Sequence, residues 1–400
     1  MRGNRKLRIG MVLDKELPDL RVENEANVLG QAGYDVVLLV LDYKEKSAHR
    51  ERKGSYSVYY QPLKKMIVKK LRPFSGTIFD IYSLIWYPLI SRFVKRENID
   101  ILHLHDLYMG LSVIGKNMPF IVDLHENYPS SVVSYNWSRK FPLNFILSKS
   151  VWKKREKQIF SAARGIITLS NYFADLLSKE YEALCLDKRF CVYPNVPSIN
   201  DLENMISDKE IYHGEKRFTL FYYGVVAERR GIFECFEALK RLQKDLPQIH
   251  LLVVGPVDNA DKNRFENYKA DLRSSVTHIP WVKFSDFASL VKEVDIGISP
   301  IKKNEQHESG VANKIFQYMY FKKPLIVSNC RPQEEIVEKA KCGYVYESGN
   351  ISDFCDKIIQ AYRERASFAD MGNNGNTAVK KKYNTVIAGK SLVGFYDRIN

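Results

Sequence analysis

The sequence has few cysteines and no pair of them at metal-binding or redox spacing. Its six cysteines stand at positions 185, 191, 235, 330, 342 and 355, and none forms a C-x-x-C pair. This scatter argues against a disulfide framework or a cysteine zinc site and is typical of reduced thiols in a cytoplasmic protein. The opening residues, MRGNRKLRIGMVLD, also lack the long apolar core and small-residue cleavage site of a signal peptide. We therefore expect residues 7–13 to form a strand.

The chain also lacks an apolar run long enough to span a bilayer. Its most apolar stretch, FSGTIFDIYSLIWYPLI, is interrupted by Asp80 and Pro88. The basic stretch LKKMIVKKLR (Leu63–Arg72) comes just before it. Two interpretations remain open for this region: a helix lying at the membrane interface, or a core helix beside a solvated basic loop.

Acidic residues are in the minority. The chain has 61 Lys and Arg residues against 47 Asp and Glu residues, which gives a net charge of +14. Such a balance favours anionic partners: nucleic acid, a phosphate-bearing substrate or an anionic membrane surface. The sequence shows no binding module that combines aromatic and basic residues, so we do not expect nucleic acid as a partner.

What the chain does have is a regular alternation of short apolar runs and helical patterns. With 400 residues it is long enough for two domains, and strands that are apolar throughout predict parallel sheets covered on both faces. The polar stretch Pro197–Phe218 interrupts the rhythm near the midpoint, and we interpret it as the interdomain connection. The predicted strands are LRIGMVL, DVVLLVLD, DILHLHD, FIVDLHE, GIITLS, FTLFYYG, HLLVVG, VTHIPW, DIGISP, PLIVS and GYVYE.

Residues with suggestive chemistry follow the ends of these strands, where ligands bind to doubly wound sheets. In VDLHENYPS, His125 follows a strand and could exchange hydrogen bonds with a substrate hydroxyl, or could simply pack. In LHLHD, His103 and His105 share one strand face with Asp106 beyond them. Because no third ligand lies at matching spacing, we favour a structural role over a metal site there.

Two further junctions could hold phosphate groups. In FYYGVVAERRGI, Arg229 and Arg230 precede Gly231 at a predicted helix start, where guanidinium groups can bind a diphosphate, although a solvated charged turn is the commoner meaning. In HESGVANKIFQYM, Ser309 could cap a helix that begins near Val311. The free backbone N–H groups at that helix start, together with Lys314, suit a phosphate, and Lys314 and Gln317 share a helix face.

Read together, these segments resemble the retaining glycosyltransferases of family 4, which have the GT-B fold. The residues LRIGMVLDKELPDLRVENEANVLGQAGYDVVLL are similar to the family's first strand, acceptor-side loop and helix, with Arg21 and Glu25 in the variant that lacks a glycine-rich loop. DILHLHD and VDLHENYP match two strand ends of the N-terminal domain, and YYGVVAERRGI matches the donor-phosphate turn. The most specific match is the donor-site block, FASLVKEVDIGISPIKKNEQHESGVANKIFQYMYFKKPLIVS.

The resemblance implies an α/β protein with two Rossmann-like doubly wound domains facing across a cleft. Residues 1–196 would form the acceptor-side domain, residues 197–382 the nucleotide-sugar domain, and residues 383–400 a helix that returns to the first. The implied reaction is retaining, metal-independent transfer of a sugar from a nucleoside diphosphate sugar to a glycan or lipid-linked acceptor, in cell-surface polysaccharide or glycolipid biosynthesis. No cofactor or metal is implied. The expected location is the cytoplasm, including the inner face of the plasma membrane for a peripheral protein.

By the same matching, three residues would carry the chemistry. Arg230 and Lys314 would neutralise the leaving diphosphate, and His125 would contact the transferred sugar. The donor-binding residues expected around them are Gly224, Arg229, Glu308, Ser309, Gly310, Val311, Asn313 and Gln317.

The sequence departs from the family pattern in two places. Many members have an arginine directly after the turn glycine, where this chain has Val225. The family's paired glutamates, separated by seven residues, fall at Ser309 and Gln317, and the second of them usually holds the nucleotide ribose. A glutamine can still accept a hydrogen bond from a hydroxyl, but without the strength that charge adds. An active transferase is our main hypothesis, and the alternatives are a non-catalytic or partner-dependent GT-B binding protein and a GT-B epimerase.

Overall fold

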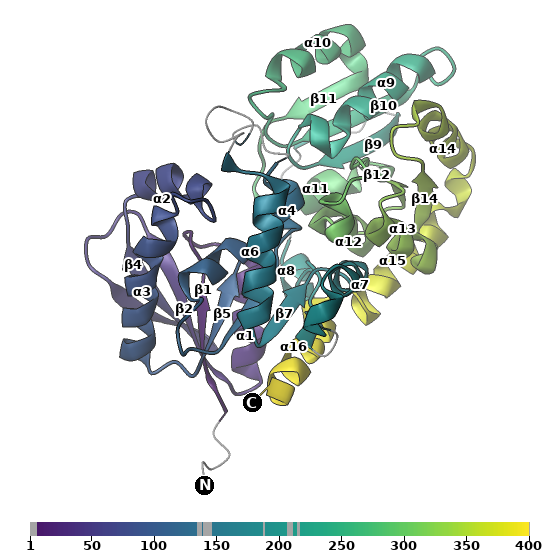
Figure 1. Ribbon diagram of the computed structural model, residues 1–400. Helices are drawn as coiled ribbons and strands as arrows, with labels where there is room; N and C mark the ends of the chain where they lie inside the picture. The colour runs from purple at the N-terminus through teal and green to yellow at the C-terminus, as the bar shows by residue number, and fades with distance from the viewer. Residues whose placement is uncertain are drawn as a thin grey trace. The chain divides into compact units, whose positions relative to one another are not determined.

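The structure is a computed structural model that describes residues 6–133, 138, 146–186, 189–205, 211–213 and 217–399 (Figure 1). The chain divides into two compact units, each with its own sheet and hydrophobic core. Unit 1 runs to Pro194 and resumes at Ala388, and unit 2 covers Asn195–Ile387. The limits expected from the sequence are residue 196 for the end of the first domain and residue 383 for the start of the helix that returns to it. Part of the polar connection expected at Pro197–Phe218 lies outside the described residues.

The sheet of unit 1 has the strand order β3-β4-β2-β1-β5-β6-β7-β8. Neighbouring strands are parallel except for the antiparallel pair β3 and β4. Central strands are apolar because both faces of the sheet are covered, and six consecutive residues of β2 are buried. The strands are β1 (Arg8–Val12), β2 (Asp35–Asp42), β3 (His49–Lys53), β4 (Tyr56–Pro62), β5 (Ile101–His105), β6 (Phe120–Asp123), β7 (Gly165–Thr168) and β8 (Phe190–Val192).

Side-chain caps fix where several helices of unit 1 begin. The side chains of Asp19, Ser148 and Ser170 each accept a hydrogen bond from a backbone N–H in the first turn of the helix that follows. The helices are α1 (Leu20–Gln31), α2 (Lys65–Leu71), α3 (Ile81–Glu97), α4 (Tyr128–Ser131), α6 (Lys149–Ala162) and α7 (Asn171–Glu180), with 3₁₀ turns η1 (Arg72–Phe74), η2 (Leu107–Ser112) and η3 (Glu182–Leu184).

Helix α3 contains the most apolar stretch of the sequence. Tyr82, Trp86, Ile90 and Phe93, spaced three or four residues apart, are buried in the core of unit 1. The core-helix interpretation is therefore confirmed for this face of α3. None of the helices that the structure describes combines the length and the apolarity needed to cross a membrane.

The sheet of unit 2 is parallel throughout, with the order β11-β10-β9-β12-β13-β14. Numbered from its first strand this is 3-2-1-4-5-6, the Rossmann order. The strands are β9 (Phe218–Tyr223), β10 (Ile249–Val254), β11 (Val276–Ile279), β12 (Ile296–Ser299), β13 (Leu325–Ser328) and β14 (Gly343–Tyr346). The helices are α8 (Ile199–Glu203), α9 (Ile232–Leu242), α10 (Lys262–Leu272), α11 (Phe287–Lys292), α12 (Asn313–Tyr320), α13 (Arg331–Ala340), α14 (Ile351–Arg363) and α15 (Phe368–Lys381), with 3₁₀ turns η5 (Glu228–Arg230), η6 (Arg273–Ser275), η7 (Phe284–Asp286), η8 (His307–Ser309) and η9 (Arg365–Ser367).

The last helix, α16 (Thr385–Ile399), packs on unit 1 (yellow in Figure 1). The hydroxyl of Tyr396 lies 2.9 Å from His103 Nδ1, and the hydroxyl of Tyr34 donates to Asp397 at 2.5 Å. A Cβ on Gly165 of β7 would lie 2.2 Å from the ring of Phe395, so the helix sits directly against the strand. The end of the chain thus completes the first unit.

Candidate functional site

Each sheet has one point where the strand order reverses. In unit 1 it lies between β1 and β5, and in unit 2 between β9 and β12. Ligands of doubly wound proteins bind beside the carboxyl ends of the strands at this point, because the loops there diverge. In unit 2 the predicted donor-binding residues follow β9 and β12, and in unit 1 His125 follows β6, the next neighbour of β5.

The turn after β9 holds two arginines with different surroundings. Arg229 Nη1 lies 3.5 Å from a carboxylate oxygen of Asp258, whereas Arg230 forms no ion pair with a residue that the structure describes. Gly231, at φ 73°, allows this turn to lie close to the end of β12, because a Cβ there would come within 1.6 Å of the Pro300 carbonyl oxygen. The guanidinium of Arg230 therefore keeps its donors for another group.

Lys314, in the first turn of α12, is a buried cation. Its side chain belongs to a residue that is only 8% exposed, and its Nζ lies 4.0 Å from the centroid of the Tyr222 ring. Burial, followed by the charge of nearby Arg230, lowers the pKa of Lys314 to about 7. No carboxylate among the described residues forms an ion pair with it. A buried ammonium without a counter-charge is unfavourable, and an anionic ligand would relieve that cost.

One turn along the same helix, Gln317 offers an acceptor. It is 5% exposed, and its Oε1 has no hydrogen-bond partner among the described residues. Lys314 and Gln317 are three residues apart on one helix face, while Ile315 and Met319 are fully buried in the core. Unpaired buried acceptors are rare, so Gln317 is suited to a hydroxyl supplied by a ligand.

The prediction that Ser309 caps this helix is wrong. Ser309 Oγ donates to the Gln306 carbonyl oxygen at 2.6 Å within η8, and α12 begins only at Asn313, with Ala312 at its N-cap and no side-chain cap. The backbone is extended at Gly310 and again at Ala312, which delays the helix beyond Val311. The backbone N–H groups at the start of α12 are thus free of a capping side chain, as an anion site requires.

Two residues beside this helix complete the description. Glu308 Oε1 lies 3.7 Å from Lys303 Nζ, so its carboxylate already has a cation. His307 was not among the residues predicted from sequence, yet it is buried, and its Nε2 has no partner among the described residues. Burial, with a contribution from Arg230, lowers the pKa of His307 to about 4 and keeps the ring neutral. A lone histidine in a polar loop gives no signal in sequence that could have identified it.

In unit 1, His125 is held between two carboxylates. Its Nε2 lies 2.9 Å from Asp123 Oδ2 and its Nδ1 lies 3.8 Å from Asp106 Oδ1. Burial by itself would lower the pKa of His125, but Asp106 and Asp123 raise it to about 9. Asp106 has φ 73°, a backbone conformation that side chains rarely adopt and that is commonest at functional sites. His125 is therefore a positioned imidazolium, with 16% of its side chain exposed.

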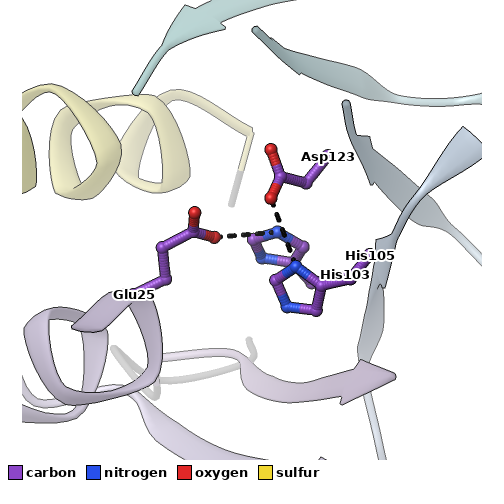
Figure 2. A group of neighbouring side chains, drawn as sticks. All are labelled: Glu25, His103, His105 and Asp123. Atoms are coloured by element: carbon purple, nitrogen blue, oxygen red, sulfur yellow. Dashed lines mark hydrogen bonds and ion pairs between the residues drawn. The ribbon is translucent and has the colours of Figure 1, made fainter. Parts of the chain in front are cut away.

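Figure 2 shows four buried side chains of a network that includes Asp123, the partner of His125: Glu25, His103, His105 and Asp123. Arg21 donates to both carboxylate oxygens of Asp123, at 2.6 and 2.9 Å, and lies 3.1 Å from Glu25. His105 Nδ1 is 3.2 Å from Asp123 Oδ2, and His103 Nε2 is 3.2 Å from Glu25 Oε2. The rings of His103 and His105 stack at 4.5 Å, which confirms that they share a strand face.

Arg21 lies close to both carboxylates of this network, but the pKa values of the two carboxyls shift in opposite directions. Burial favours a neutral Asp123, but Arg21 and His125 hold the pKa of this carboxyl well below its usual range. Burial and the neighbouring Asp123 raise the pKa of Glu25 well above its usual range, and burial lowers the pKa of His103. These shifts favour an ionised Asp123, a protonated Glu25 and a neutral His103.

The same residues could form a metal site by ligand type. The sequence offered His103 and His105 without a third ligand at matching spacing, and the fold corrects this by bringing Glu25 and Asp123 to them, with ligand atoms all within 4.8 Å of one another. Arg21, however, already neutralises Asp123 and contacts Glu25. A divalent cation would have to enter beside this guanidinium, so the observed arrangement fits an arginine-centred ion-pair network better than a metal site.

Two family descriptions match nearly the whole chain. Residues 20–195 match Glycosyltransferase Family 4, and residues 203–378 match Glycosyl transferases group 1. A curated relative, the capsular polysaccharide biosynthesis glycosyltransferase CapM of Staphylococcus aureus, is 21% identical over 192 residues, which cover 47% of this chain and 49% of CapM. The chain thus matches about half the length of this relative.

Solved structures show the same fold at low identity. Sucrose-phosphate synthase from Thermosynechococcus elongatus has 13% identity and a TM-score of 0.72, with 98% of this chain and 99% of that chain covered. Anabaena Alr3699/HepE in complex with UDP has 11% identity and a TM-score of 0.69, with 98% and 100% covered. These likenesses and the two Rossmann-like units confirm the expected GT-B fold. The chain belongs to the family 4, group 1 glycosyltransferases.

Proposed function

We propose that this protein transfers a sugar from a nucleoside diphosphate sugar to a glycan or lipid-linked acceptor, with retention at the anomeric carbon and without a metal ion. The observation that supports this most directly is Lys314, a buried ammonium near Arg230 that forms no ion pair with any carboxylate among the described residues. A diphosphate supplies two negatively charged groups and would complement both cations.

The reaction needs charge to be stabilised on the departing phosphate. When the bond between the anomeric carbon and the phosphate oxygen breaks, negative charge grows on the leaving diphosphate. A bond from the anomeric carbon to the acceptor oxygen forms, and the acceptor hydroxyl passes its proton to the departing phosphate oxygen. Arg230 and the protonated form of Lys314 are suited to the growing charge, and the first backbone N–H groups of α12 add further donors. Gln317 Oε1 would accept a hydrogen bond from a ribose hydroxyl, and the imidazolium of His125 would donate to the transferred sugar.

The class of acceptor is a further part of the proposal. CapM is named for capsular polysaccharide biosynthesis, and we extend cell-surface polysaccharide or glycolipid biosynthesis to this chain. A lipid-linked acceptor would lie on a membrane, so we place the protein in the cytoplasm, at the inner face of the plasma membrane when it works. The net charge of +14 suits such an anionic surface.

A partner-dependent or non-catalytic binding protein is the second candidate. The observation that favours it is the donor site itself: Gln317 replaces a carboxylate, and the Ser309 hydroxyl is bonded back to its own loop. Such a protein would bind a nucleotide sugar but release no nucleoside diphosphate in the presence of acceptor extracts.

A thermal-shift panel with UDP, GDP, ADP and TDP sugars tests the proposal. Ligands that bind only the native state raise its stability with the logarithm of their concentration over Kd. We expect one nucleotide class to raise the melting temperature of the parent, and Lys314→Ala to lose most of that increase. The absence of any shift across the panel would contradict donor binding. Binding of one donor with no release of its nucleoside diphosphate would instead favour the second candidate.

A further inference from the structure

Helix α3 is apolar on two opposite faces. One face is buried in the core of unit 1, and on the other Ile81, Leu84 and Tyr87 are exposed, at three-residue spacing. The loop before the helix adds Ile78 and Phe79, and Ile78 is 85% and Leu84 71% exposed. A helix that is apolar all round is normally buried, and clustered exposed apolar side chains mark an interaction site. We call Ile78, Phe79, Ile81, Leu84 and Tyr87 the apolar patch.

A cavity of about 470 Å³ adjoins this patch. Ile78 lines it and also belongs to the apolar patch, and α6 contributes Lys154 and Arg155 on its other side. Arg155 is oriented by its Nε, which donates to the Gly76 carbonyl oxygen at 3.1 Å. Lys154 is exposed and forms no ion pair with a described residue. An apolar surface and two cations therefore meet at one opening.

The segment of sequence that contains the apolar patch is strongly basic. Residues 63–96 contain eight lysines and arginines and one acidic residue, Asp80. That carboxylate caps α3, accepting hydrogen bonds from Ser83 N at 2.9 Å and Gly76 N at 2.8 Å, so it is engaged locally. Lys64, Lys69 and Lys70 are exposed. These three lysines form no ion pair with a described residue, whereas Arg72 lies 3.6 Å from Asp14 and Arg96 lies 3.9 Å from Glu97.

This charge decides between the possible occupants of the apolar patch. A second copy of the chain would bring the same excess of basic residues against itself, and like charges would oppose the contact. An anionic bilayer offers the opposite: a hydrocarbon boundary for apolar side chains and phosphates for cations. We infer that the apolar patch inserts at the surface of an anionic membrane, and that Lys154 and Arg155 bind the phosphate of a phospholipid headgroup in the adjoining cavity.

The position of Ile78 links the two parts of this docking surface. Because its side chain borders both, a lipid whose phosphate enters the cavity would have its acyl chains directed over the apolar patch. The proposal concerns membrane binding alone and requires neither donor nor turnover, so its test is separate from that of the transferase function. It predicts that apolar and basic substitutions in this surface weaken vesicle binding together, each for its own reason.

Vesicle sedimentation with the full chain tests the inference. Vesicles of phosphatidylcholine alone are compared with vesicles containing phosphatidylglycerol, at low and high salt. Two exposed positions in the docking surface supply the variants Leu84→Ser and Lys154→Ala. Leu176→Ser on α7, where the leucine is 36% exposed, is the apolar control outside the patch, and Lys157→Ala on α6 is the control for Lys154→Ala. Lys157 is exposed and does not line the cavity.

The parent should bind the anionic vesicles in a salt-sensitive manner and bind neutral ones weakly. We expect Leu84→Ser to weaken binding roughly tenfold or more, and Lys154→Ala roughly fivefold, with both controls within about twofold of the parent. Equal binding to neutral and anionic vesicles, or equal losses in Lys154→Ala and Lys157→Ala, would overturn the inference. So would a parent dimer in light scattering that Leu84→Ser dissociates, because the apolar patch would then be a contact between copies.

Discussion

The ammonium of Lys314 faces the ring of Tyr222 at 4.0 Å, near a second cation, in a site that holds its pKa near 7. Burial makes the protonated form of this amine less favourable in the folded protein than in the unfolded chain. Its usual pKa is 10.5, so the unfolded chain binds more protons between pH 7 and 10.5, and in this range the stability of the free protein rises with pH. A bound anion would reverse the balance by favouring the ammonium. The free-energy cost of the buried ammonium in the free protein is therefore relieved when a diphosphate binds.

Donor binding should take up a proton above neutral pH. With the pKa of Lys314 at about 7, most free molecules carry a neutral amine at pH 8, and each must be protonated when the diphosphate binds. We expect the affinity for the selected nucleoside diphosphate to fall about tenfold between pH 8 and 9. Calorimetric titrations in buffers of different ionisation enthalpy measure both the affinity and the proton uptake. In the control Lys314→Arg, whose cation does not titrate in this range, the pH dependence should flatten, and a flat profile in the parent would contradict the assignment.

The Oε1 of Gln317 is a buried acceptor with no partner among the described residues, so its substitution separates binding from stability. Gln317→Leu removes this atom at similar volume, and we expect it to weaken donor binding without lowering the melting temperature of the free protein. Gln317→Glu should strengthen donor binding roughly fivefold, because charged hydrogen bonds exceed neutral ones by about 1 kcal/mol. Calorimetry and thermal unfolding of the same preparations check both effects. Unchanged affinity in both variants would end the ribose assignment.

Patterns in the sequence identify some of the site residues but not the contacts between them. His125 and Arg230 follow predicted strands, and their position relative to the sheets could be derived from that fact alone. The partner of Arg21 could not, because Asp123 is 102 residues away and neither residue carries a mark of the pairing. For Ser309 the residue type predicts a contact that the structure does not contain. Serine suits a helix cap, but the extended backbone at Gly310 places the start of α12 beyond the reach of this side chain.

At the scale of the elements, apolar runs predict strands reliably, whereas a charged segment gives no indication that it forms an edge strand of a sheet. All the strands predicted from apolar runs are present, since parallel strands covered on both faces leave an unmistakable pattern. Strand β3, with the sequence HRERK, is an exposed edge strand whose charges hide it, and β8 has only three residues. Strand β4, YSVYYQP, pairs with both β3 and β2 but mixes apolar and polar residues, so its sequence lacks the apolar run that marks the other strands.

Helix α16 carries two glycines that should respond to alanine in opposite directions. A Cβ at Gly389 would lie 2.7 Å from Val28 Cγ1 of α1, and a β-branched valine has little freedom to move away. At Gly394 a Cβ meets nothing within 4 Å, so alanine only improves helix propensity. We expect Gly389→Ala to destabilise the protein by about 1–3 kcal/mol and Gly394→Ala to stabilise it by up to about 1 kcal/mol.

Thermal unfolding of the two variants and the parent provides the measurement. Both substitutions add one methyl group to the same helix, so they differ in the surroundings of that group and not in its chemistry. Equal melting temperatures for the two variants would show that α16 does not lie against α1 as described. The result bears on function as well, since Tyr396 of this helix contacts His103 in the network that includes Asp123, the partner of His125.

Over the whole molecule, positive charge is in excess, and its distribution differs between the two candidate sites. In unit 1 the cations Arg21 and His125 are paired with carboxylates, so that site is internally balanced. In unit 2 the cations Arg230 and Lys314 are not paired with any carboxylate that the structure describes. The balanced site suits a neutral sugar, and the unbalanced one suits an anion.

This distribution predicts that turnover survives removal of divalent metals. A magnesium ion binds through carboxylates, and near Lys314 it would meet Arg230 and the helix start of α12, which repel cations. Negative charge on the leaving diphosphate would instead be stabilised by Arg230 and Lys314. Initial rates with the selected donor should therefore be the same before and after dialysis against EDTA, within about twofold.

Elemental analysis of the dialysed protein should find no stoichiometric metal, because Arg21 already supplies positive charge beside the carboxylates of Glu25 and Asp123. Loss of turnover that manganese or magnesium restores would refute the mechanism proposed for unit 2, whereas retained metal with full turnover would refute only the arginine-centred account of unit 1.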